Sequence, residues 1–390
     1  MHRFVEIFLA FLRLGVTSFG GPVAHIGFFR QEFVLRRRWL EEAAYADLVA
    51  LCQFLPGPAS SQVGMGLGLA RGGYGGMLAA WLGFTLPSAL VMLLFAQGVT
   101  ELQGLAHGQW LHGLKVVAVA VVAQAVWGMA NSLCPDRLRA SFALLAALLA
   151  LSWPTALGQA GAIVAGGVGG WLWLKGPPSG STVPLEIPIG KRAGLLFFMM
   201  FFLLLSGLPL LAASFPNAAF VVLDSFYRSG ALIFGGGHVM LPLLQAEVVA
   251  NQWLDPSLFL AGYGMAQAIP GPLSTFAAYL GAVISLGPGG WTGGLLALIA
   301  IFLPSMLLIL GALPFWSRVR RWQPVQAAMQ GINAAVVGLL LAALYHPVWT
   351  GAILSARDFS LGLAAFGLLH WWRLPPWLVV LLSSGTALFW

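Results

Sequence analysis

Long apolar stretches alternate with short polar segments along the whole chain. Several approach the roughly 20 residues that cross a bilayer as a helix, although some are shorter. We predict nine spans, at 74–98, 114–132, 140–155, 158–174, 193–213, 291–313, 325–345, 358–371 and 375–390. The pattern predicts an all-α polytopic membrane protein.

Four further apolar segments are interrupted by glycine or proline. They cover 4–35, 43–70, 218–248 and 257–285, and each contains a GG or PGP sequence. Proline cannot continue a helix, and glycine weakens one. We therefore expect each segment to form a pair of half-helices that enters and leaves the membrane on one side.

The chain repeats itself. FLRLGVTSFGGP at 11–22 matches FYRSGALIFGGG at 226–237, and QFLPGPASS at 53–61 matches QAIPGPLST at 267–275. TLPS at 85–88 matches FLPS at 302–305, and Gly113 matches Gly331. The ordered series predicts two homologous halves, 1–175 and 216–390. Between them, 176–215 holds a linker (176–192) and one extra helix.

Basic residues predict how the two halves are oriented. VLRRRWLEE at 34–42 is basic, whereas its counterpart VVANQWLDP at 248–256 has no Lys or Arg. Farther along, SRVRRW at 317–322 is basic and its counterpart near 100–108 is not. Because Lys and Arg concentrate in cytoplasmic loops, equivalent loops are expected on opposite sides of the membrane. The fold class is thus two inverted-topology halves with interrupted, re-entrant helices.

Composition narrows the classes of function. The chain is 59% apolar and 8% charged, which is far too few charges to coat a soluble protein. The net charge of +7 comes from basic clusters between apolar runs, so no nucleic-acid partner is expected. The residues show no phosphate-binding GxxxxGK[ST], no metal-ligand cluster and no Ser-His-Asp arrangement in a suitable context. We expect no enzyme activity, no cofactor and no metal.

The interruptions are the predicted substrate site. Inverted-repeat carriers bind substrate where broken helices of both halves converge. The helices that follow the two PGP motifs begin with free N–H groups and hydroxyls, which favour anions. The alternative is a proline kink that these hydroxyls merely cap. The candidate residues at the two motifs are Gln53, Gly57, Ser60, Ser61, Gln267, Gly271, Ser274 and Thr275.

The glycine breaks and the charged residues near them complete the candidate set. The glycines of the two breaks are Gly20, Gly21, Gly235 and Gly236. They would either expose backbone N–H groups to a ligand or allow close helix packing, and the pattern does not decide between these two interpretations. Charged residues within membrane segments are functional candidates by default. The remaining substrate candidates are Arg13, Arg228, His25 and His238, and the proton-coupling candidates are Glu32 and Glu247, with a structural Arg–Glu pair as the alternative.

The motifs together resemble the chromate ion transporter family. The resemblance rests on FGGP at 19–22, HIGFFRQEFV at 25–34, WLEEAAYADLVALCQFLPGP at 39–58 and GYGG at 73–76. The two-half layout is similar to the long-chain members of that family. Gly237 departs from the pattern because it replaces the proline of FGGP. The resemblance implies an inner-membrane protein that exports chromate and confers chromate resistance, with sulfate as a similar competitor.

We therefore predict a secondary-active carrier that moves a tetrahedral divalent oxyanion by alternating access. One alternative is a channel-like pathway for sulfate or another anion, and a second is a membrane protein that binds the anion without moving it. The direction of transport, the coupling ion and the natural anion stay open. A homodimer also stays open, and its only basis is that many carriers dimerise.

Overall fold

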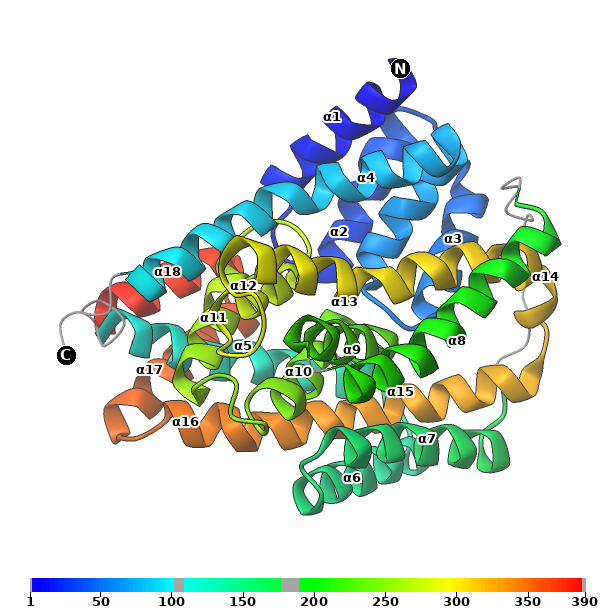
Figure 1. Cartoon of the computed structure of the whole chain (residues 1–390). Coiled ribbons are helices and arrows are strands. Elements are labelled where there is room, and N and C mark those ends of the chain that lie inside the picture. The colour runs from blue at the N-terminus through cyan, green and yellow to red at the C-terminus, as the bar shows by residue number, and fades with distance from the viewer. Residues whose placement is uncertain (1, 102–108, 177–188, 216, 388–390) are drawn as a thin grey trace.

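A computed structural model describes residues 2–101, 109–176, 189–215 and 217–387 of the 390-residue chain. The described residues form helices joined by turns, as the apolar pattern predicts (Figure 1). The predicted linker 176–192 lies for the most part outside the described residues, as does the end of the last predicted span.

The first half of the duplicated sequence forms seven α-helices and one π-helical turn. They are α1 (His2–Thr17), α2 (Gly21–Phe29), η1 (Arg30–Arg36), α3 (Glu42–Phe54), α4 (Ala59–Glu101), α5 (Gln109–Leu133), α6 (Arg137–Ser152) and α7 (Ala156–Trp173). The predicted extra helix follows as α8 (Lys191–Ser214).

The second half follows the same order with more short turns. Its elements are α9 (Ala218–Ala231), η2 (Gly237–Val239), α10 (Met240–Val248), α11 (Pro256–Ala268), η3 (Leu273–Thr275), α12 (Phe276–Val283), α13 (Gly290–Ala312), η4 (Leu313–Phe315), α14 (Trp316–Val319), α15 (Gln323–Ala343), η5 (Leu344–Trp349), α16 (Thr350–Ala352), α17 (Ala356–His370) and α18 (Pro376–Ala387).

Among the described residues, five helical stretches are long and apolar enough to cross a membrane. They are Ala59–Thr100, Gln109–Leu133, Lys191–Ser214, Gly290–Val319 and Gln323–Ala352. The other predicted spans are the shorter helices α6, α7, α17 and α18, which have 16, 18, 15 and 12 described residues. Helix α7 lies just above the lower limit of about 17 residues for a span, and the other three lie below it.

The predicted helix interruptions are confirmed at all four places. The GG sequences separate α1 from α2 and α9 from η2, and the PGP sequences separate α3 from α4 and α11 from η3. Helix α4 is itself broken at Gly72 and Gly73, where the backbone leaves helical geometry. This break divides the interrupted segment 43–70 from the predicted span 74–98.

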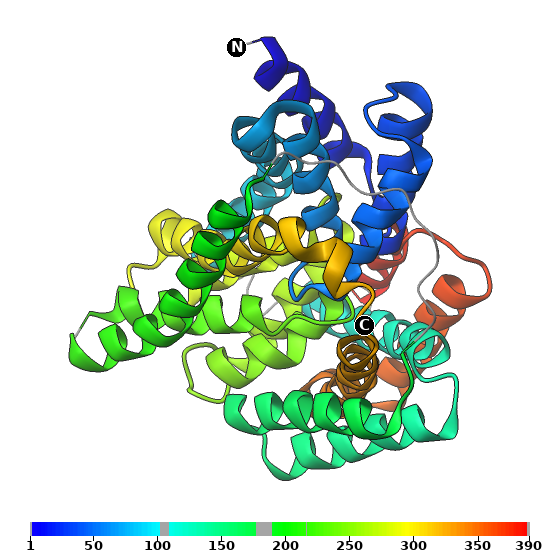
Figure 2. The ribbon, with the colours of Figure 1, turned by 90° about the vertical axis from the view of Figure 1, so that its right-hand side faces the viewer.

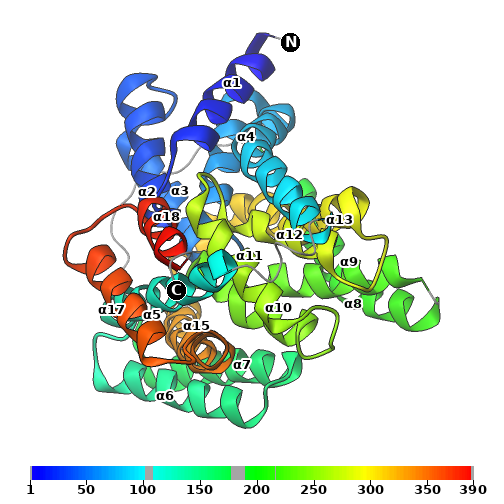
Figure 3. The same cartoon turned by 90° about the vertical axis from the view of Figure 1, so that its left-hand side faces the viewer.

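The last helices of each half pack on the other half. Helices α6 and α7 lie along α15, whereas α17 and α18 lie along α5 (Figure 3). Gly331 on α15 meets the backbone of Gly166 and Gly170 on α7 so closely that a Cβ would overlap it. Its twin Gly113 on α5 meets α18, where a Cβ would come within 2.8 Å of the Ser383 carbonyl oxygen. Small residues allow such close crossings, and here they join the halves reciprocally.

Contacts between distant segments gather the basic residues at one end of the molecule. Arg320 Nη1, just after α14, lies 2.7 Å from Asp47 Oδ1 on α3, which also accepts from Trp316 Nε1 at 3.0 Å. Arg37 lies 2.6 Å from Glu32 and 3.8 Å from Glu6. Figure 2 looks onto this end, where α14 of the second half approaches the blue helices of the first. The basic segment of the second half therefore meets α3, which follows the basic segment of the first half.

A second cross-half contact marks the opposite end. His112 Nε2, near the start of α5, lies 2.6 Å from Asp358 Oδ1, near the start of α17. Asp358 also accepts hydrogen bonds from the Leu354 backbone and the Ser355 hydroxyl, both at 3.0 Å. Each end of the molecule thus has a polar contact that ties one half to the other.

Candidate functional site

The glycine breaks adopt backbone angles that other residues avoid. Gly20 and Gly21 have φ of 102° and 77°, and Gly235 and Gly236 have φ of 72° and 138°. Glycine reaches these positive values without the steric cost that a Cβ imposes. Each break can therefore end one helix and start the next in a different direction inside the protein.

Each PGP turn docks on the glycine break of the other half. The N–H of Gly57 donates to the Ile233 carbonyl at 2.6 Å, and the N–H of Gly271 donates to the Ser18 carbonyl at 3.1 Å. Ile233 precedes the second break and Ser18 precedes the first. The two hydrogen bonds are therefore equivalent, and they bring all four interruptions together. These two glycine N–H groups are consequently already engaged within the protein.

The same turns also press against the matched TLPS and FLPS sequences. A Cβ on Gly57 would lie 2.5 Å from the Cβ of Ser305, and a Cβ on Gly271 would lie 2.8 Å from the Oγ of Ser88. Ser88 and Ser305 belong to opposite halves from the glycines that they contact. The same contact therefore occurs twice at the centre of the molecule, once from each half to the other.

Two cavities adjoin at this centre. Cavity A encloses about 640 Å³ and cavity B about 620 Å³, both within the range of ligand pockets. They share Gly20, Ala125, Gly128 and His238 as lining residues. Cavity A lies between the first glycine break and the second PGP turn, and cavity B between the second break and the first turn.

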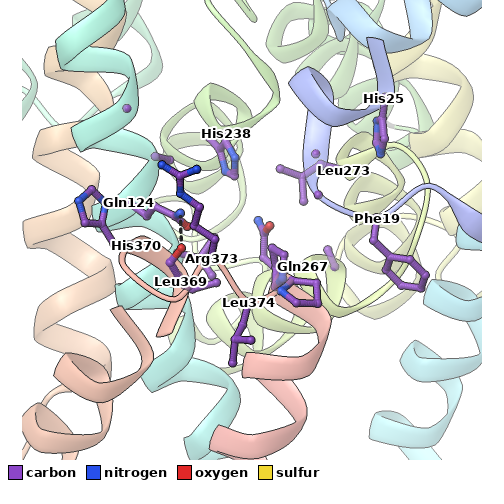
Figure 4. A pocket seen from close by; sticks show the side chains of 18 of the residues that line it. Phe19, His25, Gln124, His238, Gln267, Leu273, Leu369, His370, Arg373 and Leu374 are labelled. Atoms are coloured by element: carbon purple, nitrogen blue, oxygen red, sulfur yellow. Dashed lines mark hydrogen bonds between the residues drawn. The ribbon is translucent and has the colours of Figure 1, made fainter. Parts of the chain in front are cut away.

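Cavity A is lined by an arginine and by histidine and amide side chains (Figure 4). Its polar lining residues are His25, Gln124, His238, Gln267, His370 and Arg373. Residues of α5 and of the turn between α17 and α18 form one wall, and the interrupted helices form the other. None of the described residues that line it is a carboxylate, so the cavity suits an anion.

Hydrogen bonds fix the two histidines of the interruptions. His25 is buried, with Nε2 3.2 Å from the Ser18 carbonyl and Nδ1 3.4 Å from the Ser60 hydroxyl. The Ser18 carbonyl can only accept, so Nε2 carries the proton. His238 Nδ1 lies 2.8 Å from the Tyr263 hydroxyl, which leaves Nε2 as the ring nitrogen for a ligand.

Cavity B is polar, and none of the described residues that line it is Asp, Glu, Lys or Arg. Its polar lining residues include Gln53, Ser132 and Asn333, together with Cys52 and the backbone of the second glycine break. The Oδ1 of Asn333 is buried and has no hydrogen-bond partner among the described residues. The twin glutamines are therefore divided, with Gln53 in cavity B and Gln267 in cavity A.

The structure gathers many of the predicted site residues at the two cavities. Those that line them are Gly20, Gly21, His25, Gln53, Gly57, Gly235, Gly236, His238, Gln267 and Gly271. The hydroxyl residues after the PGP turns lie behind this layer. Ser61 and Ser274 keep buried hydroxyls without partners among the described residues, and Thr275 donates to the Pro272 carbonyl at 2.9 Å. For Thr275, this is the capping contact that the alternative interpretation expects.

The predicted charged residues lie away from both cavities. Arg13 is exposed on α1, and Arg228 binds Asp224 at 2.8 Å and Glu247 at 3.3 Å. Glu32 instead accepts from Arg36 and Arg37. Arg228 and Glu247 therefore form an ion pair, while Arg13 and Glu32 have no such contact with each other.

Among the polar residues that line cavity A, sequence reasoning missed Gln124, His370 and Arg373. Arg373 follows Trp371 and Trp372, which suggest only an anchor at the membrane interface. One signal was present, because Pro375 and Pro376 mark a helix start as the PGP motifs do. That signal predicts a helix start, but it does not predict that Arg373 lines cavity A.

The described residues contain no group of three or more His, Cys, Asp or Glu side chains placed to hold a metal ion.

Comparison with known proteins identifies the family of the chain. Residues 5–171 and 220–388 both match the sequence model of the chromate transporter family. No solved structure matches the chain significantly.

Named relatives match almost the whole chain. A chromate transport protein of Pseudomonas aeruginosa is 29% identical over 406 residues, covering 98% of this chain and 91% of that protein. A probable chromate transport protein of Synechococcus elongatus is 27% identical, with 97% and 94% covered. An uncharacterized transporter of Methanocaldococcus jannaschii is 25% identical, with 87% and 83% covered.

Proposed function

Because the chain belongs to the chromate transporter family, we propose that it is a secondary-active carrier that moves chromate across the plasma membrane. The family is one of transporters and not of enzymes, and the chain is a multi-pass membrane protein. Export of chromate from the cell would confer chromate resistance. The observation that carries this proposal is cavity A, which lies where the interrupted helices of both halves meet.

The chemistry of cavity A suits a tetrahedral dianion. Arg373 supplies a permanent positive charge, and His238, Gln124 and Gln267 supply polar hydrogen atoms or ring nitrogens around the same space. An anion loses most of its hydration on entering such a site, and charge-assisted hydrogen bonds offset that loss. Sulfate has the same charge and shape as chromate, so it is expected to compete.

We also propose that the two halves have inverted topology and move by alternating access. The Asp47–Arg320 contact supports this, because it brings the basic segment of the second half onto α3, which follows the non-equivalent basic segment of the first half. Arg38 and Gln252 offer a test, since they are twin positions with φ of 52° and 59° and are both exposed. Single cysteines at these positions should react with an impermeant reagent from the cytoplasm and from the outside, respectively. Labelling of both from the same side would refute the inversion.

Glu247 is the carboxylate that we propose for any coupled proton. It is 5% exposed and shares Arg228 with Asp224, so two buried carboxylates compete for one guanidinium. Glu32, in contrast, is held by two arginines. A site with surplus carboxylate is better suited to bind and release a proton than one with surplus arginine.

Uptake of labelled chromate into proteoliposomes tests the function. We expect saturable uptake that unlabelled sulfate reduces, whereas protein-free vesicles show none. Imposing a pH gradient tests proton coupling, and uptake that follows it should become insensitive in Glu247→Gln. Flux that rises linearly with chromate concentration would indicate a channel instead. Absence of chromate flux in folded, inserted protein would refute chromate as the substrate.

A further inference from the structure

We propose that Arg373 is the charge anchor and the specificity-determining residue for the dianion in cavity A. This inference rests on the proposed function and names the residue that selects the class of substrate. Arg373 lies in the turn between α17 and α18 and lines cavity A. Figure 4 shows its guanidinium extending from that turn toward His238.

The turn that carries Arg373 is attached to α5 far from either end of that helix. The amide of Gln124 donates to the carbonyl of Leu369 at 3.1 Å, which fixes the end of α17, just before the turn, to α5. Helix α5 has 25 residues and begins at Gln109, so Gln124 lies roughly 22 Å along it at 1.5 Å per residue. That depth is a little past the midpoint of a candidate membrane span. Arg373 follows Leu369 by four residues and is exposed, and an arginine near such a depth is a functional candidate by default.

Arg373 has no ion-pair partner within the described ranges, and none of the described residues around cavity A is an acid. Arg228, by comparison, is shared by two carboxylates. Arg320 is likewise bound to Asp47. Arg373 is exposed where it lines cavity A, so its guanidinium is free to pair with a dianion that enters the cavity.

The backbone holds the arginine in an unusual conformation. Arg373 has φ of 52°, a left-handed value that residues with a Cβ seldom adopt. The N–H of Leu374 donates to the Leu368 carbonyl at 3.0 Å, so the turn is closed by its own hydrogen bond. Trp377, at the start of α18, contacts the ring of Phe19 with centroids 5.8 Å apart. The turn is thereby tied both to α5 and to the first glycine break.

The corresponding turn of the first half does not have this role. Helices α6 and α7 are joined at Trp153, Pro154 and Thr155, and none of these residues lines cavity B. The positive charge is therefore a feature of one cavity only. A guanidinium can bind two oxygens of a tetrahedral anion through parallel N–H groups, which a lysine cannot do.

The test compares Arg373→Gln and Arg373→Lys with Arg357→Gln, which changes an equally exposed arginine near the start of α17, outside both cavities. Binding of labelled sulfate in detergent is measured together with chromate uptake. We expect Arg373→Gln to weaken sulfate binding roughly 10–100-fold, the range for a lost hydrogen bond to a charged group. Arg373→Lys should fall between that and the wild type, and Arg357→Gln should match the wild type.

Charge selectivity separates anchoring from a structural effect. Perchlorate has the same shape as sulfate with one charge fewer, so Arg373→Gln should lose far more affinity for sulfate than for perchlorate. Equal losses for the two anions would overturn the inference. So would sulfate affinity within twofold of the wild type. Wild-type protein that neither binds nor moves any tetrahedral dianion would instead refute the proposed function.

Chemical rescue keeps the inference testable if the glutamine variant does not fold. Arg373→Cys is made in a chain whose Cys52 and Cys134 are replaced by serine. An aminoethyl methanethiosulfonate forms a mixed disulfide with the introduced thiol, releases sulfinate and restores a positive charge. Sulfate binding should return with this reagent but not with a neutral ethyl analogue. Equal binding after the two reagents would overturn the proposal.

Discussion

Cavities A and B are made by equivalent elements of a duplicated sequence, yet they differ in charge. Each lies between a glycine break of one half and a PGP turn of the other. Cavity A contains Arg373 and three histidines, whereas cavity B has Gln53, Ser132 and Asn333 with only the shared His238. The duplication therefore supplied the scaffold, and later divergence of the surrounding helices supplied the chemistry.

This difference fits a carrier better than two identical sites would. A charged compartment can attract and hold a dianion, and a neighbouring neutral compartment can let it leave. Binding that is too strong along the whole path would slow release. We propose that the anion is selected in cavity A and passes His238, which lines both cavities, on its way through cavity B.

The largest effect is expected where the two cavities are most alike. Gly57→Val and Gly271→Val each place a branched side chain against a serine of the other half at a positive φ. Overpacking and the backbone strain together should cost about 2–5 kcal/mol of folding free energy in either variant. Thermal unfolding in detergent and chromate uptake should both show the loss. Wild-type stability in either variant would contradict the described crossing of the halves.

A matched pair sharpens this first prediction. Gly271→Ala with Ser88→Gly removes the hydroxymethyl group that the new Cβ would meet at 2.8 Å. The double variant should recover part of the stability that Gly271→Ala loses. The unchanged φ of 97° should prevent full recovery. No recovery at all would mean that Ser88 is not the source of the clash.

An intermediate effect should separate the twin glutamines. Gln267→Ala removes an amide from cavity A. The Nε2 atom of Gln267 is buried and has no hydrogen-bond partner among the described residues. We expect the KM for chromate to rise roughly tenfold, as for a lost hydrogen bond to an anion. Gln53→Ala, in the neutral cavity B, should raise KM less than about threefold. Equal effects in uptake assays would show that the two cavities bind the anion alike.

The smallest effect is expected for the first arginine that the sequence singled out. Arg13 is exposed on α1 and lines neither cavity. Arg13→Gln should change both KM and maximal uptake by less than about twofold, as for most exposed substitutions. A tenfold rise in KM would return Arg13 to the substrate path and weaken the assignment to Arg373.

The interrupted helices could be predicted because local chemistry determines them. Glycine pairs and PGP sequences disrupt a helix wherever they occur, so Gly20, Gly57, Gly235 and Gly271 mark real breaks. The pairing of Gly57 with Ile233 could not be predicted in this way. It depends on how the halves cross, and no local pattern contains that information.

The charged residues show most clearly what could not be predicted from the sequence. Arg13 and Arg228 are twins in sequence, but only Arg228 has an acidic residue four positions earlier, Asp224, which it binds. That i, i+4 spacing was readable and favours a local ion pair. Arg373 has no such neighbour, and it reaches cavity A only because α17 and α18 pack on α5.

The exchange of helix pairs between the halves also sets an order of events during synthesis. Helix α7 ends at Trp173, and its packing partner α15 begins at Gln323, so about 150 residues separate their emergence from the ribosome. At roughly 5–20 residues per second, α6 and α7 wait about 8–30 s for α15. During that interval Gly166 and Gly170 must face lipid, an insertion factor or another nascent helix. The native arrangement can form only after most of the chain has been made, so assembly proceeds as a late event and not half by half.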